Sequence, residues 1–152
     1  MTGIVVGPAD VEAVVGTGLL AELDADLLAR YPGEPVNGIE PVKFRQAGGY
    51  FVLARVGDEL AGCGAFRPYD PATVELKRMF VRAPFRGRGI ARAVVEALEA
   101  EARRRGYAEA ILETAARMPE AIALYRRCGY GIIPAYGPFV GSARSVCMRH
   151  AL

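Results

Sequence analysis

The chain contains 152 residues, of which 52% are hydrophobic and 24% are charged, and its formal net charge at pH 7 is +2. This length suits one domain built around one apolar core, and the apolar content excludes a chain that is disordered along its whole length. A net charge of +2 is too small to indicate a nucleic-acid partner on its own.

The first half of the chain shows the signals of a strand, a divided helix, a loop and three more strands. A short strand is expected at residues 3–6, and the helical region that follows extends to residue 31, although Gly16 and Gly18 interrupt it. Residues 31–41 contain three prolines and two glycines, which predicts a loop. The three strand-like runs lie at residues 50–56, 59–66 and 73–82, and the first two are expected to form a hairpin.

The second half begins with a clear helical period at residues 87–105. Apolar residues recur at four-residue steps on one face, at Ile90, Val94, Leu98 and Ala102. The opposite face is expected to be solvated and carries Arg92, Glu96, Glu99 and Arg103. Gly106 provides the left-handed residue that commonly ends a helix. A strand at 107–114, a short helix from Pro119 and a terminal pair of strands follow, so the order of elements predicts a mixed α/β fold.

The cysteines and the single histidine offer little material for a metal or nucleophilic site. Cys63, Cys128 and Cys147 are widely spaced and odd in number, which argues against a disulfide framework and paired zinc ligands. His150 is the only histidine, so we expect no Ser-His or Cys-His site and no metal. No apolar run approaches the ~20 residues of a membrane span and no signal peptide is recognisable, so we expect a cytoplasmic protein that folds alone or as a small oligomer such as a homodimer.

The RGRGIA loop, residues 86–91, joins a predicted strand to the start of a predicted helix. A helix N-terminus presents unpaired backbone N–H groups, and the helix dipole adds partial positive charge there. Gly87 and Gly89 would let an oxyanion approach the main chain, while Arg86 and Arg88 would add charge. The loop therefore indicates a phosphate site, more specifically a diphosphate site; a basic turn that only joins strand to helix is the alternative.

The pattern of this loop is neither a GxxxxGK[ST] nor a GxGxxG motif, which disfavours nucleoside triphosphates and dinucleotides. Residues 75–107, ELKRMFVRAPFRGRGIARAVVEALEAEARRRGY, resemble the cofactor-binding centre of the GNAT superfamily of N-acetyltransferases. Arg86, Gly89 and Ala91 occupy the marked positions of its (R/Q)-x-x-G-x-(G/A) loop. PEAIALYRRCGY, residues 119–130, resembles the next helix of the family, so the similarity covers about residues 75–130.

The resemblance implies one GNAT domain over residues 1–152, with a mostly antiparallel central sheet, one splayed parallel strand pair and flanking helices. It also implies that acetyl-CoA is the co-substrate and that the acetyl group passes directly to an amine in a ternary complex. The loop residues implied to bind the cofactor are Arg86, Gly87, Arg88, Gly89, Ile90, Ala91 and Arg92. The pantetheine arm is expected to pair with main-chain groups of Phe80 and Val81.

Two residues match catalytic positions of the family. Glu75 matches a carboxylate that serves several members as general base, often through water; a carboxylate paired with Lys77, Arg78 or Arg82 is the alternative. Tyr125 matches the tyrosine that can protonate the departing thiolate, and an ordinary core aromatic is the competing explanation.

One position departs from the family pattern, because Met118 stands where many members have an asparagine. A methionine side chain has no oxygen to cap the helix and no amide to hold the pantetheine. This departure puts the affinity for the cofactor in question.

The acceptor is the least specified part of the prediction. The loops at 31–40 and 135–143 are expected to border its pocket, with Tyr31 and Tyr136 packing on the acceptor and either Arg67 or Arg30 binding a substrate carboxylate. Loops that only connect elements at the surface are the alternative. The acceptor is then a primary amine of a small molecule or peptide. A non-catalytic acyl-CoA-binding module on the same fold remains the rival hypothesis. A nucleic-acid partner is not expected, because the three arginines at 103–105 suit a solvated helix end.

Overall fold

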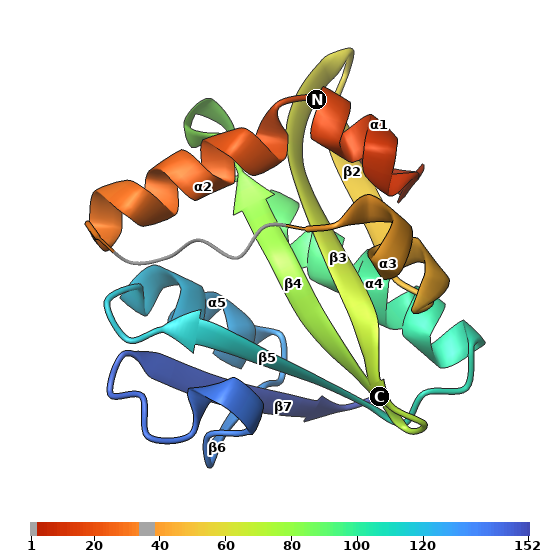
Figure 1. The fold of residues 1–152 in the computed structure, drawn as a ribbon. Coiled ribbons are helices and arrows are strands. Elements are labelled where there is room, and N and C mark those ends of the chain that lie inside the picture. Colours follow the sequence, from red (N-terminus) through yellow and green to blue (C-terminus); the bar gives the residue numbers. More distant parts are fainter. Residues whose placement is uncertain (1–2, 34–38) are drawn as a thin grey trace.

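The computed structural model describes residues 3–33 and 39–152, and its centre is a seven-stranded sheet with the order β1-β2-β3-β4-β5-β7-β6 (Figure 1). The strands are β1 (Ile4–Ala9), β2 (Tyr50–Val56), β3 (Glu59–Asp70), β4 (Thr73–Val81), β5 (Glu109–Ala115), β6 (Gly131–Ile133) and β7 (Ser145–Ala151). All neighbouring strands are antiparallel except β4 and β5, which are parallel. The predicted mixed sheet with one parallel pair is therefore confirmed.

Helices cover both faces of this sheet (Figure 1). They are α1 (Val11–Gly16), α2 (Leu19–Arg30), α3 (Pro41–Gln46), α4 (Ile90–Arg104) and α5 (Pro119–Arg127), with short 3-10 turns at Ala83–Phe85 and Gly137–Phe139. None of the helices within the described residues is long and apolar enough to cross a membrane.

The alternation of side chains along β2 divides the core between the two faces. Val52 and Ala54 belong to a cluster with Val94 of α4 and Tyr125 of α5, whereas Phe51 points to the other face. There it packs in a second cluster with residues of α1 and α2, namely Val11, Val14 and Leu19. Because successive strand residues point to opposite faces, α4 and α5 cover one face and α1 to α3 cover the other.

The parallel pair separates along its length. β4 and β5 pair only from Thr73 opposite Glu109 to Leu76 opposite Leu112, and beyond these residues the strands diverge (Figure 1). The remainder of β4, as far as Val81, stays paired with β3. The C-terminal half of β4 therefore has one edge that no described strand occupies, and the resulting splay opens the sheet.

A bulge lies on β4 at the start of this splay. The register between β3 and β4 shifts between Cys63 and Ala65, so Arg78 and Met79 together oppose Gly64. Arg78 has a φ of 57°, which is the left-handed region. It is the one non-glycine residue of the described chain with a positive φ.

Most predicted elements are present, with shifted ends. Gly16 and Gly18 do divide the first helical region, because α2 begins after Gly18 with a φ of 82°. The loop predicted at 31–41 extends over residues 34–38, which lie outside the described residues, and α3 starts inside it at Pro41. α4 starts at Ile90, three residues later than predicted, because Gly87 and Gly89 are both left-handed.

The prediction that Glu99 lies on the solvated face of α4 is wrong. Glu99 is buried, and its Oε2 accepts hydrogen bonds from Tyr130 Oη and from His150 Nδ1, each at 2.8 Å. Arg103, which is predicted on the same face, is exposed as expected. At the end of α4, Glu101 and Arg105 form an ion pair.

Glu101 makes a testable contribution to the stability of the last turn of α4. A hydrogen bond from Arg104, followed by one from Arg105, lowers the pKa of Glu101 to about 2 from an ordinary 4.5. Since the folded pKa is the lower one, the stabilisation is present above about pH 4.5 and is lost as the pH falls towards 2. We expect Glu101→Gln to lower the free energy of unfolding at pH 7 by up to about 1 kcal/mol. Urea unfolding should show this difference at pH 7 and little of it at pH 2, and a difference of equal size at both pH values would contradict the assignment.

Candidate active site

A large cavity of about 980 Å³ lies where β4 and β5 separate. It is lined by Leu76 and Met79 of β4 and by Leu112 and Thr114 of β5, with further walls from α2, α3 and α5. Glu75 and Tyr125, which belong to opposite sides of the sheet, both line it. A cavity of this volume lies at the upper end of the range for small-molecule sites. Its lining includes residues of α2 and α3 on one face of the sheet and of α5 on the other.

Glu75 is the central charged group of this cavity. Its side chain is only 2% exposed, and the carboxylate is held from both sides. Oε1 accepts a hydrogen bond from Arg67 Nε at 2.8 Å and lies 3.7 Å from Lys77 Nζ, while Oε2 accepts one from Tyr136 Oη at 2.6 Å. A buried carboxylate needs such partners, and here they fix its orientation within the cavity.

The structure shows which of the three basic residues named from the sequence lies beside Glu75. Lys77 does lie beside it, whereas Arg78 lies near Asp24 of α2 and Arg82 pairs with Glu22 of α2. The sequence placed Arg67 and Tyr136 with the acceptor and did not predict their contacts with Glu75. Register explains the first contact, because Arg67 of β3 lies opposite Glu75 of β4.

Tyr136 reaches Glu75 from the loop between β6 and β7. Its ring lies between Tyr69, with ring centroids 5.4 Å apart, and Phe139, with centroids 5.5 Å apart. Burial and the hydrogen bond to Glu75 raise the pKa of Tyr136, so its hydroxyl keeps its proton and remains a donor. This contact spans 61 positions of the sequence, and no local pattern could have indicated it.

Tyr125 is both a core aromatic and a residue of the cavity wall. It is 7% exposed and packs in the core, edge-on to Tyr130 with ring centroids 5.9 Å apart. It also lines the large cavity. Burial raises the pKa of Tyr125, so the phenol is protonated at neutral pH and can act as a hydrogen-bond donor.

The RGRGIA loop leaves its backbone open beside the N-terminus of α4. Gly87 and Gly89 have φ values of 77° and 82°, and a Cβ added to either would meet nothing within 4 Å. The backbone of the loop is therefore open on the side where a ligand could approach. Ala93 N–H donates to Gly89 O at 3.1 Å, so the N–H groups of Ile90, Ala91 and Arg92 precede the first bond of the helix.

The arginines around this loop are already engaged with the protein. Arg86 Nε donates to Val81 O at 2.9 Å, and the guanidinium lies 5.7 Å from the centroid of the Phe80 ring. Arg88 lies 5.4 Å from the centroid of Phe85, and Arg92 pairs with Glu96. Arg86 thus occupies the Val81 carbonyl, which is one of the main-chain groups assigned to the pantetheine arm.

Tyr31 and Met118, the two remaining positions discussed from the sequence, also line the large cavity. Tyr31 lines it, and the guanidinium of Arg117 lies 5.4 Å from the centroid of the Tyr31 ring. Met118 forms the N-terminal end of α5 without a side-chain cap, as its chemistry predicts, and its carbonyl accepts from Ala121 N–H at 3.1 Å.

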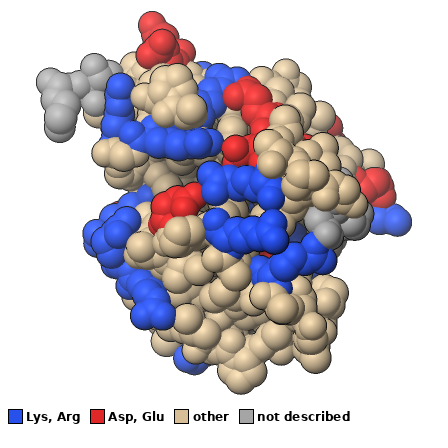
Figure 2. All heavy atoms as spheres, turned by 90° about the vertical axis from the view of Figure 1, so that its left-hand side faces the viewer, with Lys and Arg blue, Asp and Glu red and all other residues tan. Residues whose placement is uncertain are grey.

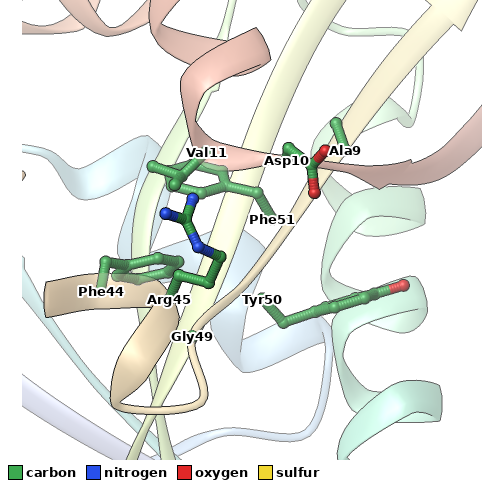
Figure 3. Close-up of a pocket in the computed structure, with 8 residues that line it drawn as sticks. All are labelled: Ala9, Asp10, Val11, Phe44, Arg45, Gly49, Tyr50 and Phe51. Atoms are coloured by element: carbon green, nitrogen blue, oxygen red, sulfur yellow. The ribbon is translucent and has the colours of Figure 1, made fainter. Parts of the chain in front are cut away.

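A second cavity of about 110 Å³ lies between α1, α3 and β2, away from these groups (Figure 3). Arg45 extends across it towards Val11 and pairs with Glu12, while Tyr50 points away from it (Figure 3). Its volume is well below that of small-molecule sites, so the large cavity is the candidate active site. Among residues 3–33 and 39–152, no group of three or more His, Cys, Asp and Glu side chains could hold a metal ion.

Known proteins resemble this chain in both sequence and fold. The sequence pattern of the acetyltransferase (GNAT) family matches residues 14–130. An IAA acetyltransferase of Azospirillum brasilense is 33% identical over 135 residues, which are 88% of this chain and 88% of that protein. The structure of a Klebsiella pneumoniae protein assigned as an acyl-CoA N-acyltransferase is 28% identical, with a TM-score of 0.80 over 98% of this chain and 97% of that one.

A third protein adds a ligand to the comparison. A GNAT family acetyltransferase of Elizabethkingia anophelis, solved with acetyl-CoA bound, shares the fold with a TM-score of 0.64, at 17% identity and over 98% of each chain. Together with the family match over residues 14–130, these similarities show that the chain belongs to the GNAT family of acetyltransferases.

Proposed function

We propose that the chain is one GNAT domain, residues 1–152, that acts in the cytoplasm as an acetyl-CoA-dependent N-acetyltransferase. The observation that carries this proposal is the cavity through the splay, because it is lined by a buried carboxylate, Glu75, and by a protonated phenol, Tyr125. The three cysteines are free thiols, in keeping with a reducing compartment.

The cofactor would enter along β4. The RGRGIA loop would hold the diphosphate through the N–H groups at the start of α4, with Arg92 in the first turn of the helix and Arg86 and Arg88 close to the charge. The pantetheine arm would lie along the open edge of β4 at Phe80 and Val81, displacing Arg86 from the Val81 carbonyl. The acetyl-CoA bound to the Elizabethkingia protein supports acetyl-CoA as the co-substrate.

The residues of the cavity suit direct transfer. The neutral amine would attack the thioester carbonyl carbon, a C–N bond would form, and the C–S bond would break. Glu75, held by Arg67 and Tyr136, would take the proton that the amine loses, directly or through water. Tyr125 would stabilise the departing thiolate through its hydroxyl. Burial raises the pKa of Tyr125, so donation of a hydrogen bond suits this residue better than complete loss of its proton.

The acceptor amine would enter from the side that carries Tyr31, Arg67 and Tyr136. Two experiments separate this enzyme from a non-catalytic acyl-CoA-binding module. Acetyl-CoA should raise the melting temperature in either case, whereas release of free thiol with a panel of primary amines should occur only for the enzyme. Binding of acetyl-CoA with no thiol release from any amine would exclude the proposed activity.

Replacing Tyr125 with phenylalanine should lower kcat by about 10- to 100-fold, the usual effect of one hydrogen bond to a charged group. The affinity for acetyl-CoA should change little, because the ring and its packing remain. Steady-state kinetics and calorimetry measure the two effects. Tyr130→Phe is the matched control, because it also removes a buried hydroxyl, here the donor to Glu99 outside the large cavity. Equal losses of kcat in both variants would make Tyr125 a packing residue only.

A further inference from the structure

Arg78 occupies an unusual position in the backbone of the active-site strand. It lies in the bulge of β4 with a φ of 57°, a left-handed conformation that is strained for a non-glycine residue. Arginine has no special tolerance for this region, unlike glycine or asparagine. The bulge turns the side chain of Arg78 into the wall of the large cavity.

The guanidinium of Arg78 is buried and incompletely paired. Its side chain is 10% exposed, and Nε is buried without any hydrogen-bond partner among the described residues. Nη1 lies 3.7 Å from Asp24 Oδ1, which is longer than a charge-assisted hydrogen bond. Burial accordingly lowers the pKa of Arg78, because the surroundings do not fully compensate the charge. A buried donor without a partner is destabilising unless a ligand accepts a hydrogen bond from it.

Among the described residues that line the cavity, cationic side chains are in surplus over acidic ones, although Asp24 lies beside Arg78. Its cationic residues are Lys43, Arg67, Lys77, Arg78 and Arg144. Its acidic residues are Glu40, Glu75 and Glu113. Figure 2 shows basic side chains gathered across the face onto which the splay opens. The diphosphate of the cofactor does not account for this surplus, because the RGRGIA loop does not line the cavity.

The reacting groups do not use the surplus either. A thioester is neutral, and an amine must also be neutral when it attacks. Burial lowers the pKa of Lys77 and raises that of Glu113, so both shifts favour the neutral form. Because one residue is a cation and the other an anion, the two shifts offset each other and the excess stays positive. Asp24, 3.7 Å from Arg78, offsets part of this excess, so the described residues leave a place for at most one further negative charge.

We propose that the acceptor is an amino acid with an apolar side chain, whose carboxylate is bound by Arg78 while its amine faces Glu75. The inference rests on the function proposed above and names its substrate class. Arg78 Nε and a terminal nitrogen present the fork that suits a carboxylate. The side chain of the acceptor would contact the apolar wall formed by Leu23, Leu27, Ile39 and Phe139. Phenylalanine is thus a suitable probe, and phenethylamine is the matched amine without the carboxylate.

The test compares these two probes in three proteins. Wild type should prefer phenylalanine over phenethylamine by about 10- to 100-fold in kcat/KM, the range for a hydrogen-bonded charge pair. In Arg78→Gln this ratio should fall towards one through a higher KM for phenylalanine, and Arg78→Lys should restore part of it. Arg103→Gln removes the same charge from an exposed position on α4 and should keep the wild-type ratio.

Calorimetry with protein saturated with CoA makes the test independent of turnover. Phenylalanine should bind about tenfold or more tightly than phenethylamine, and Arg78→Gln should abolish the difference. If wild type binds neither probe, or binds both equally, or if Arg78→Gln keeps the preference, the inference is wrong. If the preference is present but no thiol is released from acetyl-CoA, the carboxylate site stands and the proposed activity fails.

Discussion

Replacing Glu75 with glutamine should lower kcat by about 100-fold or more, the usual contribution of a general base. The affinity for acetyl-CoA should stay within a few-fold of wild type, because Glu75 lines the large cavity, to which the RGRGIA loop does not contribute, and takes no part in holding phosphate. A loss in kcat with unchanged cofactor binding is the signature of an interaction made in the transition state.

Glutamine is the appropriate replacement because it keeps the shape of the site. Its amide oxygen can still accept the hydrogen bond from Tyr136, but its nitrogen cannot accept one from Arg67 and cannot take up a proton. The variant therefore removes the base and deprives Arg67 and Lys77 of the negative charge of Glu75. Some loss of melting temperature is expected for the same reason.

Glu99→Gln separates this loss of stability from the loss of the base. Glu99 is also a buried carboxylate with two hydrogen-bonded partners, Tyr130 and His150, but it does not line the large cavity. Both variants should melt at lower temperature, and only Glu75→Gln should lose turnover. Measurements of kcat over a range of pH complete the test, and unchanged turnover of Glu75→Gln would remove Glu75 from the role of base.

The elements that the sequence predicts well are those that local patterns control. The four-residue apolar period of α4 and the left-handed Gly106, with a φ of 89°, both describe interactions within one segment. The same holds for the hairpin between β2 and β3. The elements that the sequence misses depend on distant segments. α3 is held by packing of Phe44 against Phe51, with ring centroids 5.1 Å apart, and this contact has no signature in PVKFRQ itself.

Glu99 shows how a periodic pattern can mislead. Its charge assigned it to the wet face of α4, but its partners lie 31 and 51 residues further along the chain. The Arg78 bulge is hidden for a similar reason, since a strand pattern contains no signal that an arginine will adopt a positive φ. In the candidate site, the sequence named Glu75 and Tyr125, and both line one cavity. The grouping of Arg67, Lys77 and Tyr136 around Glu75 required the register of β3 against β4 and the fold of the last loop.

Replacing Gly89 with valine should weaken the binding of acetyl-CoA by about 100-fold or more, the equivalent of two or so charge-assisted hydrogen bonds. A Cβ at Gly89 would meet no protein atom within 4 Å, so the space that a branched side chain would fill is available to a ligand. Valine would hold the diphosphate away from the N–H groups of Ile90 and Ala91. It would also be strained, because the φ of Gly89 is 82°.

Gly106→Val is the control that isolates this strain. Gly106 lies just beyond the other end of the same helix, has a φ of 89° and also has nothing within 4 Å of an added Cβ. Both variants should therefore lose similar stability, by of order 1–2 kcal/mol from the left-handed conformation. Only Gly89→Val should lose affinity in calorimetry with acetyl-CoA. If both variants bind the cofactor as wild type does, the RGRGIA loop does not hold the diphosphate. If both lose affinity equally, the effect belongs to the fold of α4 and not to a contact at its N-terminus.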